Sequence, residues 1–202
     1  MLDWTDAEQI IATISKRLGR TPEYEPAQPR DALTASAVLV PIAAFGAHPS
    51  LVLVRRSNRT RYHKGQIGFP GGVVEDSDPD LVSAALREAY EEAGIPRDAV
   101  DLLGALAPTE TITGFLIHPF VGVLREQVEF KRDEREIQEI LLVPLEAFAC
   151  GPDSTMEFWL GGKSFLVSAF FLHDAVVWGA TARIILSLFR DGLGIDLLTK
   201  GE

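Results

Sequence analysis

The most informative segment of this chain reads Arg87-Glu88-Ala89-Tyr90-Glu91-Glu92-Ala93-Gly94-Ile95. Its three acids, Glu88, Glu91 and Glu92, have the spacing i, i+3 and i+4, which places them on one face of a helix. A separate apolar face can pack on a sheet, and it consists of Val82, Ala85, Leu86, Ala89 and Ala93. The segment therefore predicts a helix that is anchored by one face and presents clustered carboxylates on another.

The flanking residues predict where this helix begins and ends. Asp78 followed by Pro79 is a typical start, with the aspartate as N-cap and the proline in the first turn. Gly94 can take the left-handed conformation that ends a helix, and Pro96 prevents its continuation. We therefore expect the helix to run from Asp78 to about Ala93.

An acidic helix face has two interpretations. One is a solvated surface on which Arg87 partly neutralises Glu91, and this is the commoner case for an acidic triplet alone. The other is a site for a hard divalent cation, because Mg²⁺ prefers oxygen ligands and often bridges carboxylates to substrate phosphates.

The residues upstream favour the cation site. Gly71 and Gly72 allow the backbone to come close to a ligand or metal. A basic run without an intervening acid precedes them and could attract phosphate groups; it consists of Arg55, Arg56, Arg59, Arg61, His63 and Lys64. A cation site, a close-approach loop and an anion-attracting run within forty residues form a combination that chance rarely supplies.

The bulk composition is that of one globular domain. The chain has 202 residues, 47% of them apolar and 24% charged. Its net charge of −10 argues against binding to nucleic acid or to an anionic membrane. The single Cys150 excludes an internal disulfide and fits a reducing compartment. The N-terminus has no secretory pattern and no apolar run could cross a bilayer, so we expect a cytoplasmic protein; a homodimer stays open.

The remaining elements mix strands with helices. Thr5 and Glu8 have the spacing of a capping box that opens an amphipathic helix over residues 5–18, and a proline-containing connector follows over residues 19–33. Strands are expected at residues 35–44, 51–55, 102–107, 115–124 and 139–143, and a further helix at 174–190. This mixture predicts an α/β or α+β sandwich. We divide the chain into an N-terminal helix and connector, 1–30, and a main domain, 31–202.

Residues Gly72–Ile95 resemble the Nudix box, in which a glycine, five residues, a glutamate and seven residues precede Arg-Glu-U-x-Glu-Glu-x-Gly-U, where U is a bulky aliphatic residue. The second half matches apart from the small Ala89. The first half departs, because Asp78 stands where the glutamate is expected and eight residues then precede Arg87.

A loop longer by one residue resembles the coenzyme A diphosphatase branch of this family. The branch motif is matched upstream by Leu53-Val54-Arg55-Arg56-Ser57, Arg61, His63, Gly65-Gln66 and Phe69-Pro70-Gly71-Gly72. Similar segments downstream are Thr113-Gly114 with Pro119, Glu136–Glu139 before Val143-Pro144-Leu145, and Trp178–Ala182. The resemblance covers about residues 35 to 190.

The resemblance implies a Nudix-type α/β/α sandwich with a mixed β-sheet. It implies hydrolysis of the diphosphate of coenzyme A or acyl-CoA, giving 4′-phosphopantetheine, or its acyl form, and adenosine 3′,5′-bisphosphate. A Nudix enzyme for ADP-ribose, dinucleotides or nucleoside triphosphates is the alternative, and a non-catalytic nucleotide sensor is a second one. The resemblance also implies a small-molecule substrate and Mg²⁺ or Mn²⁺ as the cofactor.

Residue roles follow from the same resemblance. The metal would be held by Glu88, Glu91 and Glu92 with the Gly72 carbonyl, and Arg87 would orient the glutamates. The general base would be Glu139, with Glu136 or a helix glutamate as alternatives; a surface pair with Arg132 or Arg135 is the competing interpretation for both. Substrate contacts are expected from Arg55, Arg56, Arg61, His63 and Gly71. Phe69 and Trp178 are expected in the core, with stacking on adenine as the alternative. Phe165, Phe170 and Phe171 are also expected in the core, with a pantetheine or acyl pocket as the alternative.

Overall fold

Strand β1 (Thr34–Ala43) runs through the middle of the larger sheet, and its apolar composition explains this position. Residues 36–43 are all buried, as expected for a strand that is covered on both faces. It pairs in parallel with β7 (Phe115–Leu124), in unbroken register from Thr34 opposite Phe115 to Ala43 opposite Leu124. The structure is a computed structural model, and it describes residues 2–19, 33–57 and 65–198.

The other neighbours in this sheet are antiparallel, so the sheet is mixed. Within the described residues it contains eight strands, and its central order is β3-β2-β1-β7-β5, with β4 beside β1, β6 beside β7 and β8 beside β2. These strands are β2 (Ser50–Arg56), β3 (Ile67–Gly68), β4 (Gly71–Val73), β5 (Asp101–Ala105), β6 (Thr109–Glu110) and β8 (Ile137–Pro144). A short 3-10 turn, Arg97–Ala99, precedes β5, and another, Leu145–Phe148, follows β8.

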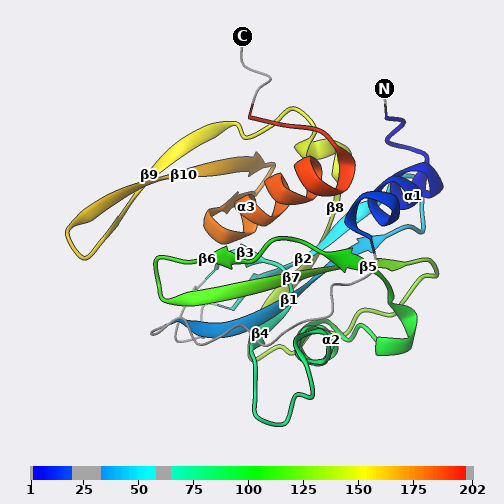
Figure 1. Ribbon diagram of the computed structural model, residues 1–202, viewed down its shortest axis with the longest axis horizontal. Coiled ribbons are helices and arrows are strands. Elements are labelled where there is room, and N and C mark those ends of the chain that lie inside the picture. Colours follow the sequence, from blue (N-terminus) through cyan, green and yellow to red (C-terminus); the bar gives the residue numbers. More distant parts are fainter. Residues whose placement is uncertain (1, 20–32, 58–64, 199–202) are drawn as a thin grey trace.

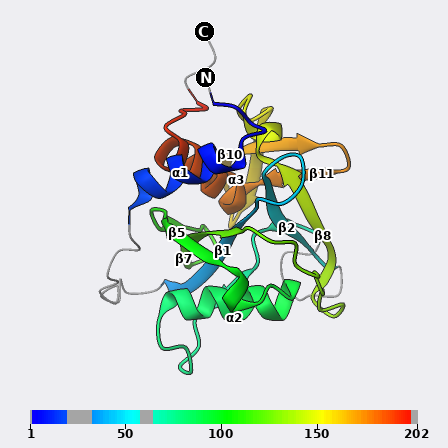
Figure 2. The same cartoon turned by 90° about the vertical axis from the view of Figure 1, so that its right-hand side faces the viewer.

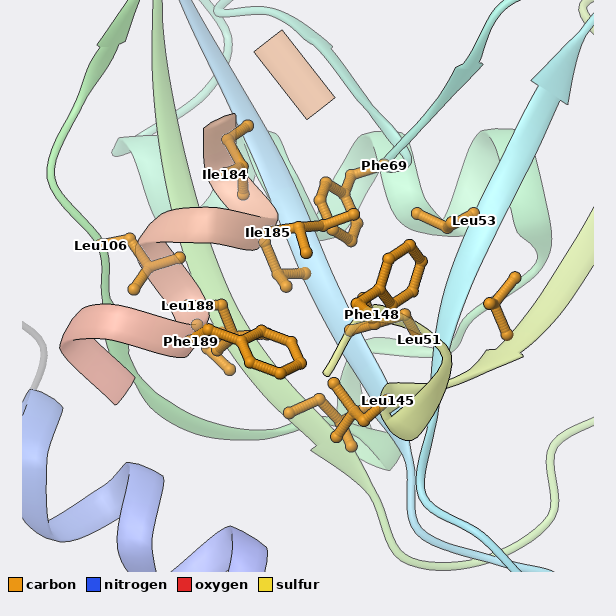
Figure 3. Packing of buried hydrophobic residues seen from close by; sticks show 14 of the residues in the cluster. Leu51, Leu53, Phe69, Leu106, Leu145, Phe148, Ile184, Ile185, Leu188 and Phe189 are labelled. Carbon is orange, nitrogen blue, oxygen red and sulfur yellow. The ribbon is translucent and has the colours of Figure 1, made fainter. Parts of the chain in front are cut away.

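Helices cover both faces of the sheet (Figures 1 and 2). Helix α2 (Leu81–Ala93) lies on one face, and α1 (Ala7–Leu18) and α3 (Gly179–Ser187) lie on the other. Each layer has its own apolar cluster, one that includes α2 and one that includes α1 and α3. Figure 3 shows the second cluster, in which Phe148 and Phe189 are fully buried. The predicted α/β/α sandwich with a mixed sheet is confirmed.

A second sheet joins the α3 layer and was not predicted. Its strands are β9 (Ser154–Leu160), β10 (Lys163–Leu172) and β11 (Ala175–Trp178), in the order β11-β10-β9. The hairpin of β9 and β10 extends away from the body of the molecule (Figure 1). Phe170 at its base is buried and meets Phe148 edge to face, with ring centroids 5.2 Å apart.

Several predicted helix boundaries were wrong. Helix α1 begins two residues later than expected because Asp6, and not Thr5, is the N-cap; the Asp6 side chain accepts a hydrogen bond from Gln9 N. The expected helix at 174–190 begins as β11, whose Val176 and Val177 favour a strand. Helix α3 then follows and continues as a π-helical turn over Leu188–Leu193.

The acidic helix also begins later than predicted. The N-cap of α2 is Asp80, whose carboxylate accepts a hydrogen bond of 2.7 Å from Ser83 N. Asp78 is used elsewhere, as described below. The predicted end is confirmed: Gly94 has φ 70° and ψ 22°, and its N–H bonds to the carbonyls of Ala89 and Tyr90. None of the helices in the described part of the chain has the length and apolar character to span a membrane.

Candidate active site

The three acids of α2 lie at very different depths. The helix packs on the sheet through Ala85, Ala89 and Ala93, which are fully buried. This orientation leaves 55% of the Glu91 side chain exposed, 16% of Glu88 and 4% of Glu92. The predicted acidic face therefore exists, and it reaches from the solvent into the junction between α2 and β4.

Glycines at 71 and 72 allow this junction to close. Gly71 pairs with Val38 of β1, and a Cβ atom at Gly71 would lie 2.5 Å from the carbonyl oxygen of Ala37. A Cβ atom at Gly72 would lie 2.5 Å from Cδ of Glu88. The backbone of β1 excludes a side chain at position 71, whereas a side chain at position 72 would force the Glu88 carboxylate to move. The Glu88 carboxylate therefore occupies the space that a side chain at position 72 would need.

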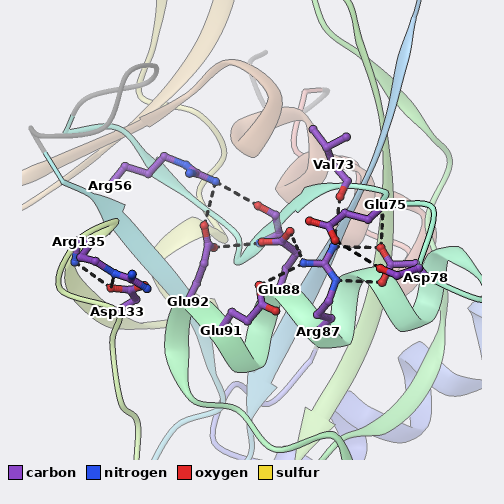
Figure 4. A network of polar contacts seen from close by, with 12 residues as sticks. Arg56, Val73, Glu75, Asp78, Arg87, Glu88, Glu91, Glu92, Asp133 and Arg135 are labelled. Carbon is purple, nitrogen blue, oxygen red and sulfur yellow. Dashed lines mark hydrogen bonds and ion pairs between the residues drawn. The ribbon is translucent and has the colours of Figure 1, made fainter.

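Arg87 is the centre of a charged network beside this junction (Figure 4). Its Nε and Nη2 donate to the two oxygens of Asp78 at 2.9 and 3.0 Å, and its Nη1 donates to Glu88 at 2.8 Å and to Glu91 at 3.1 Å. Nη2 also donates to the Val73 carbonyl at 3.3 Å. These bonds lower the pKa of Asp78. Asp78 is thus an anchor for Arg87 and not a helix cap.

Glu92 forms a closed ring with Gly71 and Arg56. Its Oε2 accepts a hydrogen bond from Gly71 N at 3.1 Å, and its Oε1 lies 3.2 Å from Nη2 of Arg56. The same Nη2 donates to the Gly71 carbonyl at 3.1 Å. Burial nevertheless raises the pKa of Glu92 to about 7, against the opposing effect of Arg56 and the Gly71 amide. Burial also raises the pKa of Glu88.

Arg55 faces the other side of the sheet. Side chains alternate along a strand, so Arg55 points to the same side as Leu53 and Leu51, into the layer of α3. There its Nε donates to Glu139 at 3.0 Å and its Nη2 to Asp174 at 3.2 Å. Arg55 and Asp174 line a cleft of about 600 Å³, together with Gln66 and Trp178 among others.

The structure therefore separates residues that the sequence grouped together. Glu139 pairs with Arg55 on the α3 side, and its partner is neither Arg132 nor Arg135. Those two arginines pair with Glu134 and Asp133. Glu136 lies on the side of the carboxylate helix, because it belongs to the turn in which Glu136 N bonds to Asp133 O at 3.1 Å and Asp133 N bonds to the Glu92 carbonyl at 3.2 Å. The structure brings Arg87, Glu88, Glu91, Glu92, Gly71, Gly72 and Arg56 together.

Several predicted contacts lie outside the described residues. These are Arg59, Arg61, His63 and Lys64 of the basic run. The structure adds Asp78 and Asp174, which the sequence analysis had not assigned to the site. Asp78 could have been found from its place in the box-like spacing, where an acid is expected. Asp174 carried no signal, since its contact with Arg55 joins two different sheets.

The site fits a divalent cation by its chemistry. Its donors are carboxylate oxygens from one helix face, and Gly72 lets the Glu88 carboxylate come close to the backbone of β4. Within residues 2–19, 33–57 and 65–198, however, no group of three or more acidic, histidine or cysteine side chains is arranged to hold a metal ion. The carboxylates hold arginines instead. Cation binding would use the carboxylate lone pairs of Glu88 and Glu91 that their contacts with Arg87 leave free, while Arg87 keeps its two bonds to Asp78.

Comparison with known proteins agrees with this fold. The NUDIX domain pattern matches residues 33–160, which is more than half of the chain. The chain belongs to the Nudix family and is a Nudix hydrolase, a pyrophosphatase. Members of this family generally use divalent metal cations.

The chain is similar to two bacterial proteins that carry the name "Uncharacterized Nudix hydrolase NudL". The protein from Citrobacter koseri is 40% identical over 154 residues, which are 76% of this chain and 80% of that protein. The protein from Cronobacter sakazakii is 37% identical over 184 residues, 90% and 95% of the two chains. Among solved structures, an Ap4A hydrolase from C. elegans in a binary complex is 20% identical, covers 55% of this chain and 80% of its own, and has a TM-score of 0.49.

Proposed function

We propose that this Nudix hydrolase cleaves the diphosphate bond of coenzyme A or acyl-CoA with Mg²⁺ or Mn²⁺. The products would be 4′-phosphopantetheine, or its acyl form, and adenosine 3′,5′-bisphosphate. The observation that carries the proposal is the graded carboxylate face of α2 against Gly71 and Gly72, with Glu92 buried in the junction. A buried carboxylate beside two further acids is costly unless a positive group compensates it.

The chain's own residues would prepare the diphosphate for attack. Glu88, Glu91 and Glu92 would hold the cation, with the Gly72 carbonyl as a further oxygen donor. Arg87, anchored by Asp78, would set the orientation of Glu88 and Glu91 through the Nη1 contacts of 2.8 and 3.1 Å. A bound cation would neutralise phosphate charge and acidify the attacking water. Arg61, His63 and the Gly71 backbone remain proposed substrate contacts, on the motif alone.

Glu136 is the better candidate for the general base. Glu139 pairs with Arg55 in the α3 layer, on the opposite side of the sheet from α2. Glu136 precedes β8 and its charge acts on Glu92. A base must come within hydrogen-bond reach of the water that it activates, which favours the residue on the same side as the carboxylates.

The cleft on the α3 side of the sheet, which the α2 carboxylates do not line, would take a part of the substrate that is remote from the diphosphate. The cleft beside Arg55 and Trp178 is open, and its volume of about 600 Å³ is in the range of small-molecule sites. Arg55 is held there by Glu139 and by Asp174, whose side chain is 65% exposed. A phosphate or carboxylate group of a substrate could replace Asp174 on Arg55 at little cost, because exposed ion pairs are weak.

The test is product analysis after incubation of coenzyme A with the protein and Mg²⁺ in ¹⁸O water. We expect 4′-phosphopantetheine and adenosine 3′,5′-bisphosphate, with ¹⁸O in one product, which identifies the phosphorus that is attacked. ADP-ribose is assayed side by side. A strong preference for ADP-ribose would contradict the coenzyme A assignment and support the alternative Nudix substrates.

A pair of variants tests the metal assignment. Glu91→Gln should lose at least about 100-fold in turnover while the protein stays folded, because a charged cation ligand is replaced by a neutral amide. Glu134→Gln is the matched control, since Glu134 is 80% exposed and pairs only with Arg132 at 3.5 Å among the described contacts. Equal turnover in the two variants would overturn the role of the α2 carboxylates.

A further inference from the structure

We propose that Arg56 is a positioning residue that holds the Glu92 carboxylate for the cation, and that it does not bind the substrate. This inference rests on the metal-dependent activity proposed above and assigns a different role to an arginine of the basic run. It is carried by the closed ring of Arg56, Gly71 and Glu92.

The ring fixes both oxygens of one carboxylate. Oε2 of Glu92 accepts from Gly71 N at 3.1 Å, and Oε1 faces Nη2 of Arg56 at 3.2 Å. Nη2 also donates to the Gly71 carbonyl at 3.1 Å, so Arg56 is itself tied to the backbone that holds Glu92. Each carboxylate oxygen keeps a free lone pair, because it uses only one of the two for this ring. The arrangement leaves Glu92 oriented and still able to bind a cation.

The burial of the pair supports a structural task for Arg56. The Glu92 side chain is 4% exposed and that of Arg56 is 27% exposed. An arginine that is already bound to a buried carboxylate and a carbonyl would have to break a buried pair before it could bind a phosphate, and breaking such a pair is costly. A group that orients a ligand of a metal commonly changes metal affinity when it is removed.

The neighbouring arginine provides a contrast. Arg55 differs from Arg56 by one position and therefore leaves the strand on the other side of the sheet, where it lines the open cleft. Its partner Asp174 is 65% exposed. Of these two adjacent arginines, Arg55 is thus the one that can exchange its partner for a substrate group, and Arg56 is the one that is committed to Glu92.

The direction in which cation affinity changes when Arg56 is removed distinguishes a positioning role from a purely electrostatic effect of its charge. Removing a positive charge 3.2 Å from Glu92 should by electrostatics alone tighten the binding of a cation. Removing a positioning contact should weaken it. The quantity to measure is therefore the affinity of Mn²⁺ for the protein without substrate, followed by the electron paramagnetic resonance signal of free Mn²⁺.

We expect Arg56→Ala to weaken Mn²⁺ binding by about 10- to 100-fold, the range found for groups that orient metal ligands. Arg125→Ala is the matched control, because Arg125 also pairs with two carboxylates, Glu8 and Asp101, but is 46% exposed and belongs to another part of the surface. It should leave Mn²⁺ affinity unchanged. Unchanged or tighter binding in Arg56→Ala would overturn the inference.

Arg56→Lys keeps the charge and serves as a second variant should Arg56→Ala fail to fold. Its Mn²⁺ affinity should lie between those of the wild type and Arg56→Ala, with an unchanged KM for coenzyme A at saturating Mn²⁺. The reverse pattern, an increased KM with normal Mn²⁺ affinity, would make Arg56 a substrate contact and reject the inference. Glu92→Gln separates the two levels of the argument. Unchanged Mn²⁺ affinity in Glu92→Gln would refute the assignment of Glu92 as a metal ligand. Unchanged Mn²⁺ affinity in the Arg56 variants, together with weaker binding in Glu92→Gln, would refute only the positioning role of Arg56.

Discussion

Replacing Glu92 by glutamine should change how the stability of the cation-free protein depends on pH. In the folded protein, burial raises the pKa of this carboxyl from its ordinary value of 4.5 to about 7. The folded protein therefore binds the proton more tightly than the unfolded chain does. Unfolding releases this proton between pH 4.5 and 7, so the free energy of unfolding falls as the pH rises through that range.

The size of the effect follows from the two pKa values. The interval between 4.5 and about 7 corresponds to a loss of about 3 kcal/mol. This stability is fully present below pH 4.5 and is lost once the pH has passed about 7. Glu88 also has a raised pKa and contributes in the same direction, but it is present in both proteins. The lowered pKa values of Asp78 and Asp191 act at more acidic pH than this range.

The assay is urea unfolding followed by tryptophan fluorescence in EDTA at pH 5, 6, 7 and 8. The wild type should lose stability relative to Glu92→Gln by about 2 to 3 kcal/mol between pH 5 and 8. Glu134→Gln, which changes an exposed acid, should follow the wild type. Parallel curves for the wild type and Glu92→Gln would refute the claim that Glu92 is a buried, destabilised carboxylate.

Adding a divalent cation provides the complementary measurement. If the cation binds Glu92 in its ionised form, saturating Mg²⁺ should stabilise the wild type more at pH 8 than at pH 5, since protons compete for the same carboxylate. The same addition should have a smaller effect on Glu92→Gln. An equal stabilisation of both proteins at both pH values would show that the cation binds elsewhere.

Two further variants test the contacts around the site. Asp78→Asn should lower the free energy of unfolding by about 2 kcal/mol in urea titrations, because a charged bidentate contact with Arg87 is lost; Asp101→Asn, which alters an exposed pair, should cost less than about 1 kcal/mol. Similar costs for the two would argue against the anchoring role. Gly72→Ala should reduce turnover about 100-fold, because the new Cβ would displace the nearby Glu88 carboxylate. Gly68→Ala is the control and should retain activity, since its new Cβ would meet its nearest neighbour at 3.7 Å. Full activity in Gly72→Ala would exclude the steric argument.

Features that depend on neighbouring residues were well predicted. The helix face of Glu88, Glu91 and Glu92 follows from helical periodicity alone. The end of the helix follows from the glycine at position 94, because glycine readily adopts the left-handed conformation observed there. The start was misplaced because Asp78 and Asp80 are both good caps by composition. The choice between them depends on Arg87, nine residues after Asp78, which binds the Asp78 carboxylate and leaves Asp80 to cap the helix.

Features that depend on strand pairing were not predicted from the sequence. The hairpin of β9 and β10 was missed, and the segment 175–178 was assigned to a helix, because short apolar stretches are ambiguous until their partners are known. Glu139 was grouped with the carboxylate helix for the same reason. Its pairing with Arg55 depends on the register between β2 and β8, which joins residues 84 positions apart.

From its residues alone this chain could be recognised as a Nudix hydrolase with a carboxylate helix, since local periodicity and motif spacing need no knowledge of distant contacts. The side of the sheet on which each charged group acts became known only from the folded chain. Arg55 and Arg56 are chemically identical neighbours, yet strand alternation sends one to an open cleft and the other to a buried glutamate. Partners of this kind are brought together by sheet pairing and helix packing, and the order of residues does not specify them.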